Sequence, residues 1–142
     1  MIERWIRWEP IKGLSKKYYI ESITDNIRGF KIILSDSNDE NKKLQITFGN
    51  SVDSYKSTYE SFQQKMLFDL EQKYGPDFFT EWTYFKVLNS EYLAYLSQQS
   101  YGITDSLSLM HFSFISMEFI VDIIASSEPK VKFITSKNKK SK

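Results

Sequence analysis

A single histidine and an aspartate on neighbouring predicted strands are the residues best suited to acid–base chemistry. Apolar residues alternate along 107–115 and 119–125, which read as two strands joined around Ser116-Met117. A symmetric turn there places residues whose numbers sum to 233 opposite each other, so that His111 faces Asp122. The same register matches three apolar pairs: Phe114–Phe119, Phe112–Val121 and Met110–Ile123. We expect a structural surface pair worth about 0.2–1 kcal/mol, with a histidine–aspartate acid–base unit as the alternative.

Other catalytic and metal-binding patterns are missing from the sequence. The chain has no cysteine and one histidine, which excludes thiolate zinc sites, disulfides and a histidine cage within one chain. The five glycines are at least 16 residues apart, so the sequence has no phosphate-binding glycine loop, and no serine lies in a Gly-x-Ser-x-Gly motif. We therefore predict that the protein is not an enzyme and has no catalytic residue, cofactor or metal ion.

The acidic stretch around Asp36, Asn38 and Glu40 has oxygen-bearing side chains at the first three ligand positions of a calcium loop. Its sixth position is Asn41 and its twelfth is Thr47, where such a loop needs glycine and glutamate. The segment 35–41 is therefore predicted to be a solvated acidic loop.

Bases alternate with aromatic residues in Arg4-Trp5-Ile6-Arg7-Trp8, a pattern that is able to stack nucleic-acid bases. Single-stranded nucleic-acid binders repeat such a pattern across a sheet, and this chain does not. We expect an edge segment that packs its rings against the protein.

The formal net charge of +1 hides a strong asymmetry along the chain. Residues 1–35 carry +3, residues 36–128 carry −8 and residues 129–142 carry +6. We expect the six lysines at the end to belong to a solvated tail that serves solubility, with a nucleic-acid arm as the alternative. Without that tail the domain is acidic, a balance that repels phosphate and attracts basic partners.

The remaining periodicity predicts an α+β domain. Strands are expected at 18–24, 30–34, 44–48, 82–88, 107–115 and 119–125, and helices at 62–74 and 90–99, whereas 52–60 is ambiguous. Short turns between strands favour an antiparallel sheet of about five to six strands with the two helices largely on one face. Glu128-Pro129 is expected to close the fold. One domain is predicted over 1–134, followed by a flexible lysine-rich tail at 135–142.

Three segments carry a resemblance to a known group of proteins: 54–60 (SYKSTYE), 82–93 (WTYFKVLNSEYL) and Met110-His-Phe112 leading to Val121-Asp-Ile123. Over about residues 1–130 the chain resembles the small cytoplasmic immunity proteins of wall-associated polymorphic toxins, the WapI-like group that is paired with WapA-type tRNA nucleases. The resemblance implies a monomeric inhibitor that binds the C-terminal nuclease domain of the toxin and blocks its active site.

The leading hypothesis is therefore an immunity protein that inhibits a basic nuclease domain, without direct contact to nucleic acid or membrane. No signal peptide or spanning segment is expected, and the predicted location is the cytoplasm. The alternatives are a small RNA-acting hydrolase using His111 and Asp122, and a generic interaction domain. The residues predicted to bind the partner are acids in three clusters and two aromatic neighbours: Asp36, Asp39 and Glu40; Asp69 and Glu71; Asp77 and Glu81; Phe78 and Phe79.

Overall fold

The computed structural model describes residues 2–135, which form nine strands and two α-helices. The strands are β1 (Arg4–Arg7), β2 (Tyr18–Asn26), β3 (Gly29–Asp36), β4 (Asp39–Gly49), β5 (Val52–Tyr59), β6 (Tyr84–Leu88), β7 (Met110–Ile115), β8 (Phe119–Ala125) and β9 (Lys130–Thr135). The helices are α1 (Gln64–Tyr74) and α2 (Glu91–Gln99), with 3-10 turns η1 (Glu60–Phe62) and η2 (Ile103–Ser106). Among the described residues no helix is long and apolar enough to cross a membrane.

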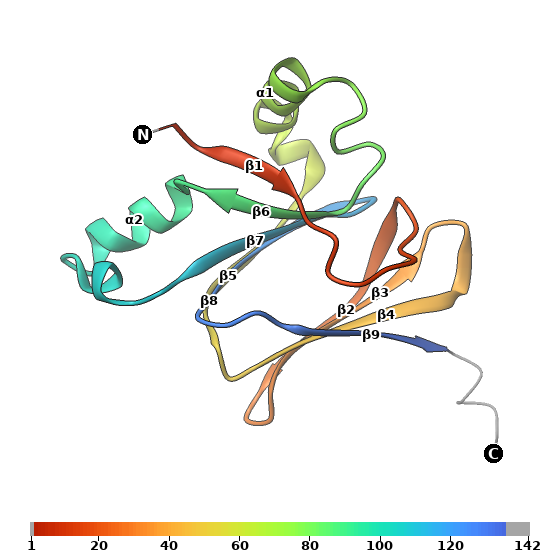
Figure 1. Cartoon of the computed structure of the whole chain (residues 1–142), viewed down its shortest axis with the longest axis horizontal. Helices are drawn as coiled ribbons and strands as arrows, with labels where there is room; N and C mark the ends of the chain where they lie inside the picture. Colours follow the sequence, from red (N-terminus) through yellow and green to blue (C-terminus); the bar gives the residue numbers. More distant parts are fainter. Residues whose placement is uncertain (1, 136–142) are drawn as a thin grey trace.

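The strands are divided between two antiparallel sheets. The five-stranded sheet has the order β1-β6-β7-β8-β5, and the four-stranded sheet has the order β2-β3-β4-β9. The two sheets lie against each other, with the four-stranded sheet at the lower right in Figure 1. The α+β class and the antiparallel pairing predicted from the sequence are confirmed, although the strands form two sheets and not one.

The main core lies between the two sheets. Alternate residues of each strand point into it, including Ile32 and Leu34 of β3 and Phe112 and Phe114 of β7, which are fully buried. Burial of this apolar surface is the main stabilising contribution to the fold. Lys17, just before β2, joins this segment to the loop before β6 and to the end of β7, because its Nζ donates hydrogen bonds to the carbonyls of Phe79, Trp82 and Ile115. Burial lowers the pKa of Lys17 to about 8.

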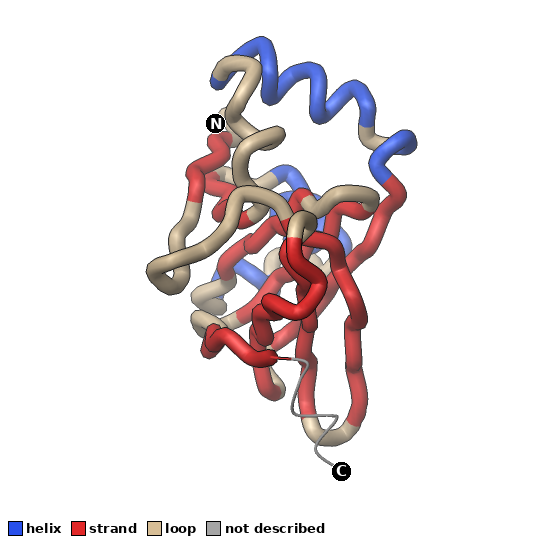
Figure 2. The backbone as a smooth tube through the Cα atoms, turned by 90° about the vertical axis from the view of Figure 1, so that its right-hand side faces the viewer, coloured by secondary structure: helices blue, strands red, loops and turns tan. Residues whose placement is uncertain are grey.

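Both helices cover the opposite face of the five-stranded sheet. A second apolar cluster there joins Leu70 of α1 to Trp5, Phe85, Ile115 and Ile120 of the strands. Helix α1 lies at one end of the molecule in both Figure 1 and Figure 2. The prediction that the helices lie largely on one face is consistent with this arrangement. The resulting order of layers is helices, five-stranded sheet and four-stranded sheet.

Several predicted element boundaries are corrected. The loop expected at 35–41 is only a two-residue turn at Ser37-Asn38, because β3 and β4 continue to either side of it. The ambiguous segment 52–60 is mostly the edge strand β5. The fold does not close at Pro129, since β9 pairs with β4 and includes Thr135. The rest of the predicted tail, residues 136–142, lies outside the described residues.

The predicted register of β7 and β8 is wrong by two residues. Opposite residues sum to 235: Phe112 pairs with Ile123, and Ser113 pairs with Asp122. The connection is longer than a two-residue turn, because Ser116 closes it with backbone and side-chain hydrogen bonds to Phe119. A shift of two residues keeps every side chain on its predicted face, so apolar alternation alone does not detect it.

Candidate functional site

Three polar side chains form a hydrogen-bonded chain beneath α2. Ser90 Oγ lies 2.7 Å from His111 Nδ1, and His111 Nε2 lies 2.8 Å from Asp122 Oδ1. The three residues come from the start of α2, from β7 and from β8, on the face of the five-stranded sheet that the helices cover. The predicted contact between His111 and Asp122 is therefore present, although the register that predicted it is wrong.

The local sequence explains why Ser90 occupies this position. Asn89 has a positive φ of 54°, which turns the chain from β6 into the helix. Ser90, the first residue of the helix predicted at 90–99, is the N-cap of α2, and its Oγ accepts a hydrogen bond from the Leu93 amide at 3.0 Å. Glu3 Oε2 accepts from the Glu91 amide at 2.8 Å, so a second side chain satisfies the helix terminus.

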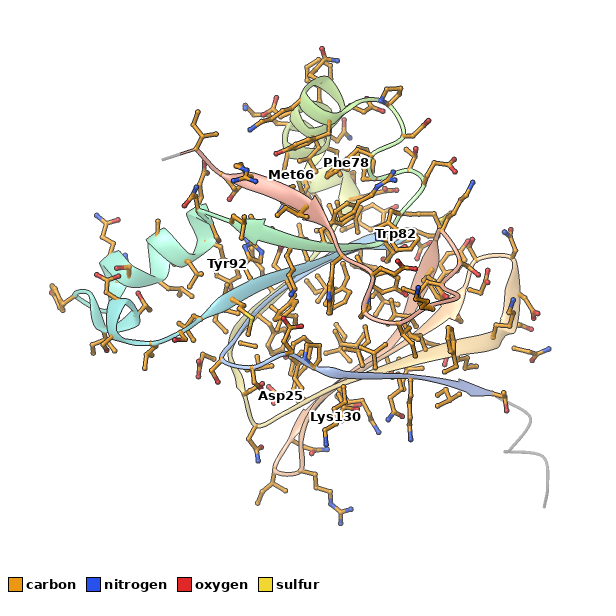
Figure 3. The ribbon with its side chains drawn as sticks, in the orientation of Figure 1. Asp25, Met66, Phe78, Trp82, Tyr92 and Lys130 are labelled. Atoms are coloured by element: carbon orange, nitrogen blue, oxygen red, sulfur yellow. The ribbon has the colours of Figure 1, made fainter. Side chains whose placement is uncertain are left out.

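The hydrogen-bonded network of Ser90, His111 and Asp122 is buried, which corrects the prediction that His111 and Asp122 form a surface pair. The side chains of His111 and Asp122 retain 4% and 7% exposure. Tyr92 packs edge-on against the His111 ring at 5.6 Å between centroids. Figure 3 shows Tyr92 between α2 and the five-stranded sheet. When the neutral ring carries its proton on Nε2, His111 donates to the Asp122 carboxylate and Nδ1 accepts from the Ser90 hydroxyl.

Serine, histidine and aspartate joined in this order by hydrogen bonds are the groups of a catalytic triad with a serine nucleophile. Ser90 is the member of this set that was not predicted from the sequence. A cavity of about 170 Å³ is lined by Ser90, His111 and Leu93 among others. The Ser90 oxygen already caps α2, and an attack on a substrate would require it to leave the Leu93 amide. The arrangement therefore serves first to fasten α2 to the sheet. Among residues 2–135 no cluster of three or more histidine, aspartate or glutamate side chains is arranged to hold a metal ion.

The acids predicted to bind a partner have different environments. Asp36 is 5% exposed, so its prediction as an exposed acid is wrong. Its carboxylate accepts hydrogen bonds from the Ser15 hydroxyl and from the Asn38 amide, the latter at 2.8 Å. Asp36 therefore stabilises the β3–β4 turn. Asp39 and Glu40 follow it at the exposed start of β4.

The acids of α1 and of the following loop lie at the surface beside basic groups. Asp69 forms an ion pair with Lys65 at 2.8 Å, and Glu81 forms one with Lys16 at 2.6 Å. The hydrogen bond and the charge of Lys16 lower the pKa of Glu81. Glu71 is half-buried and Asp77 is exposed. These solvent-exposed pairs are weak, so their acids remain available to a competing basic partner.

The two predicted interface aromatics, Phe78 and Phe79, are half-buried and packed against neighbouring aromatic residues. Phe78 stacks on Tyr74 at 4.4 Å between centroids and contacts Phe85, and both Phe78 and Phe79 pack against the second apolar cluster. The Arg7 guanidinium lies 5.7 Å from the Phe78 ring centroid. In Figure 3, Phe78 and Met66 lie next to α1 and β1. These contacts make Phe78 a residue that fastens α1 and the loop after it.

Acidic residues are concentrated in one layer of the fold. We call residues 60–83 and 89–106 the helical layer; they contain seven acids and two lysines, a net charge of −5. On the four-stranded sheet, Lys31, Thr47 and Lys130 lie side by side in one row, and Lys132 lies beside Gln45 in the next row. These side chains alternate with core residues and therefore point away from the core. The helical layer is therefore the acidic side of the protein, whereas the four strands of the other sheet carry five acids and five lysines and are neutral overall.

A group of exposed aromatic residues was not identified from the sequence. Tyr59 is 46% exposed, Phe62 80% and Phe119 37%. Phe62 is the first residue of the helix predicted at 62–74, but it lies in η1 before α1 begins. If residues 52–59 had been predicted as a strand that pairs with 119–125, Tyr59 would have been placed next to Phe119.

Comparison with known proteins adds no relative to this description. No protein-family model, curated protein or solved structure matches the chain.

Proposed function

We propose that this chain is an immunity protein that binds and inhibits a basic nuclease domain of a bacterial polymorphic toxin. The observation that carries the proposal is the acidic helical layer, which has a net charge of −5 and lies on one side of the five-stranded sheet. Several of its acids are exposed, including Asp69, Asp77, Glu91 and Asp105. The resemblance to WapI-like immunity proteins supports the same function, with action as a monomer in the cytoplasm.

The physical basis of the proposal is charge complementarity. A nuclease that cleaves RNA presents basic groups to the phosphates of its substrate, and an acidic protein surface is attracted to the same groups. The attraction acts mainly on the association rate and weakens with ionic strength, because the Debye length falls to about 8 Å at physiological salt. The exposed acids of the helical layer would pair with the basic groups of the phosphate-binding surface, and the bound protein would exclude RNA from it.

The test combines binding and inhibition. The purified chain is mixed with the nuclease domain encoded next to its gene, and the complex is isolated by co-purification. Cleavage of tRNA is followed on a gel with increasing amounts of the chain. We expect a stoichiometric complex, loss of cleavage at excess chain and an association rate that falls as salt is raised. Undiminished cleavage with no complex would contradict the proposal.

A hydrolase is the second candidate, because Ser90 completes a Ser-His-Asp chain next to a cavity. Activity would require His111 to take the proton of the Ser90 hydroxyl as its oxygen attacks an ester or phosphate, and to give that proton to the alcohol that leaves when the original ester bond breaks. Incubation of the chain alone with tRNA and with an activated ester separates the two functions. Turnover that is lost in Ser90→Ala would favour the hydrolase, and its absence with full inhibition of the nuclease would favour the inhibitor.

A further inference from the structure

Three exposed aromatic rings meet where the five-stranded sheet joins the helical layer. Tyr59 at the end of β5 and Phe119 at the start of β8 are directly paired across the strands, with their ring centroids 5.6 Å apart. The Phe62 ring in η1 lies 6.4 Å from that of Tyr59. Phe62 has 80% exposure, so most of its apolar surface is in contact with water. An exposed apolar group of this kind is typical of an interaction site.

Two carboxylates flank the rings. Glu60 follows Tyr59 and Glu118 precedes Phe119, and both residues are exposed. In the described part of the chain neither carboxylate has an ion-pair partner, in contrast to Asp69 and Glu81. The charge of Glu60 acts on the pKa of Lys17, which it raises against the larger effect of burial, but the Lys17 ammonium donates its hydrogen bonds to three backbone carbonyls and not to Glu60. The surface therefore combines apolar rings with two carboxylates that form no ion pair within the described residues.

Two backbone hydrogen bonds fix the segments that carry the group relative to each other. The Glu60 amide donates a hydrogen bond to the Glu118 carbonyl at 2.9 Å, which joins the two segments that carry the rings. The Gln63 amide donates to the Glu60 carbonyl at 2.9 Å and closes the turn that presents Phe62. A surface that is already ordered loses little conformational entropy on binding.

We infer that Tyr59, Phe62 and Phe119, together with Glu60 and Glu118, form the energetic centre of the surface that binds a basic protein partner. This inference rests on the proposed function and specifies where in the acidic side the nuclease is bound. The partner that fits is a protein surface with an apolar pocket bordered by lysine or arginine. Phe62 inserts into the pocket, and the two glutamates pair with the bases around it.

The two kinds of residue should act on different rate constants. Removal of a buried aromatic anchor raises the dissociation rate, whereas removal of a charge at the rim lowers the association rate and its salt dependence. The chain offers a matched control for each. Phe68 of α1 is a second exposed phenylalanine, at 59%, outside the group, and Asp25 is an exposed acid on the β2–β3 hairpin of the other sheet. Figure 3 shows Asp25 far from α1.

The test measures binding of four full-length variants to the nuclease domain encoded beside the gene. Phe62→Ala is expected to weaken binding at least about 30-fold, mostly through faster dissociation, whereas Phe68→Ala stays within about threefold of the parent chain. The double variant Glu60→Gln/Glu118→Gln is expected to associate more slowly and with less salt dependence, whereas Asp25→Asn is unchanged. Unfolding midpoints of all variants establish that they remain folded.

The outcomes separate this inference from the proposed function. Phe62→Ala and Phe68→Ala with equal effects on a complex that forms would overturn the inference and leave the proposed function intact. No complex with the parent chain would overturn both. As an independent measurement, hydrogen exchange of residues 59–62 and 117–120 should slow in the complex with the parent chain. Protection confined to the four-stranded sheet would also contradict the inference.

Discussion

His111 and Asp122 are hydrogen bonded diagonally across β7 and β8, because Asp122 lies opposite Ser113 and His111 lies opposite Ile124. Diagonal neighbours in an antiparallel pair are within reach of a long side chain. The contact is buried, and the Ser90 hydroxyl occupies the other ring nitrogen. Its main consequence is for stability, since both ring nitrogens of a buried histidine have a partner.

We expect His111→Ala to lower the free energy of unfolding by about 3 kcal/mol or more, because it leaves the Asp122 carboxylate buried without its partner. Asp122→Asn should cost less, since an amide oxygen still accepts from Nε2. Chemical denaturation of both variants measures the difference. Neither variant should abolish binding of the nuclease while it is folded, because both groups lie beneath α2 and away from the surface. Loss of about 100-fold in binding by a folded variant would show that the pair acts directly in recognition.

The faces of the strands could be predicted from the sequence, but their register could not. Alternation in β7 and β8 correctly separated Phe112 and Phe114 from His111, since it depends only on a period of two residues. The register depends on how the connection closes, and here the Ser116 side chain lengthens it. Strand β9 escaped prediction because half of its residues are exposed lysine or threonine, and pairing with β4 rather than an apolar run holds it in the sheet.

Ser90 and Ser113 provide a matched pair of buried serines. Ser90 Oγ joins His111 to the Leu93 amide, whereas Ser113 Oγ has no hydrogen-bond partner within residues 2–135. Ser90→Ala should therefore lower the free energy of unfolding by about 1–3 kcal/mol. Ser113→Ala should leave it unchanged or raise it slightly, because an unsatisfied hydroxyl is removed. Thermal or urea unfolding measures the stability of both variants. An equal loss of the free energy of unfolding in Ser90→Ala and Ser113→Ala would mean that the hydrogen bonds of Ser90 make no specific contribution.

Gly29 is required by its geometry at the start of β3. Its φ is +120°, and an added Cβ would lie 2.9 Å from the Gly49 carbonyl oxygen of β4. At Gly49, with φ +65°, an added Cβ meets nothing within 4 Å. We expect Gly49→Ala to cost about 1–2 kcal/mol from backbone strain alone, and Gly29→Ala to cost clearly more because backbone must also shift. Denaturation midpoints compare the two, and a smaller loss for Gly29→Ala would contradict the close approach of β3 and β4.

The acids of the candidate surface show what composition is able to predict and what it is not. The charge balance of 36–128 correctly indicated an acidic body, but it could not distinguish Asp36, which is buried at a turn, from Glu118, which is exposed. Phe78 and Phe62 are both phenylalanines near α1, and only the tertiary packing decides that Phe78 is covered and Phe62 is not. Local sequence does not contain that information, because the covering residues come from distant strands.

Lys17 gives the protein a specific dependence of stability on pH. Burial lowers its pKa in the native state to about 8, whereas the unfolded chain keeps a value near 10.5. Below pH 8 both states carry the proton, and the native state bears the full cost of burying the ammonium. Between pH 8 and 10.5 the unfolded state binds more protons, so the free energy of unfolding rises with pH, by about 3 kcal/mol at most.

Comparison of the parent chain with Lys17→Met isolates this contribution from the other lysines and tyrosines that titrate in the same range. The difference in the free energy of unfolding, parent minus variant, should increase as the pH rises from 8 to 10.5. Lys16→Met is the control, because Lys16 is exposed and its contact with Glu81 raises its pKa. The contribution of Lys16 to stability is present below pH 10.5 and is lost only as the pH rises through its native pKa. The free energy of unfolding of the parent minus that of Lys16→Met should therefore not increase between pH 8 and 10.5. A flat difference for Lys17→Met would mean that the three carbonyls keep the Lys17 ammonium protonated throughout.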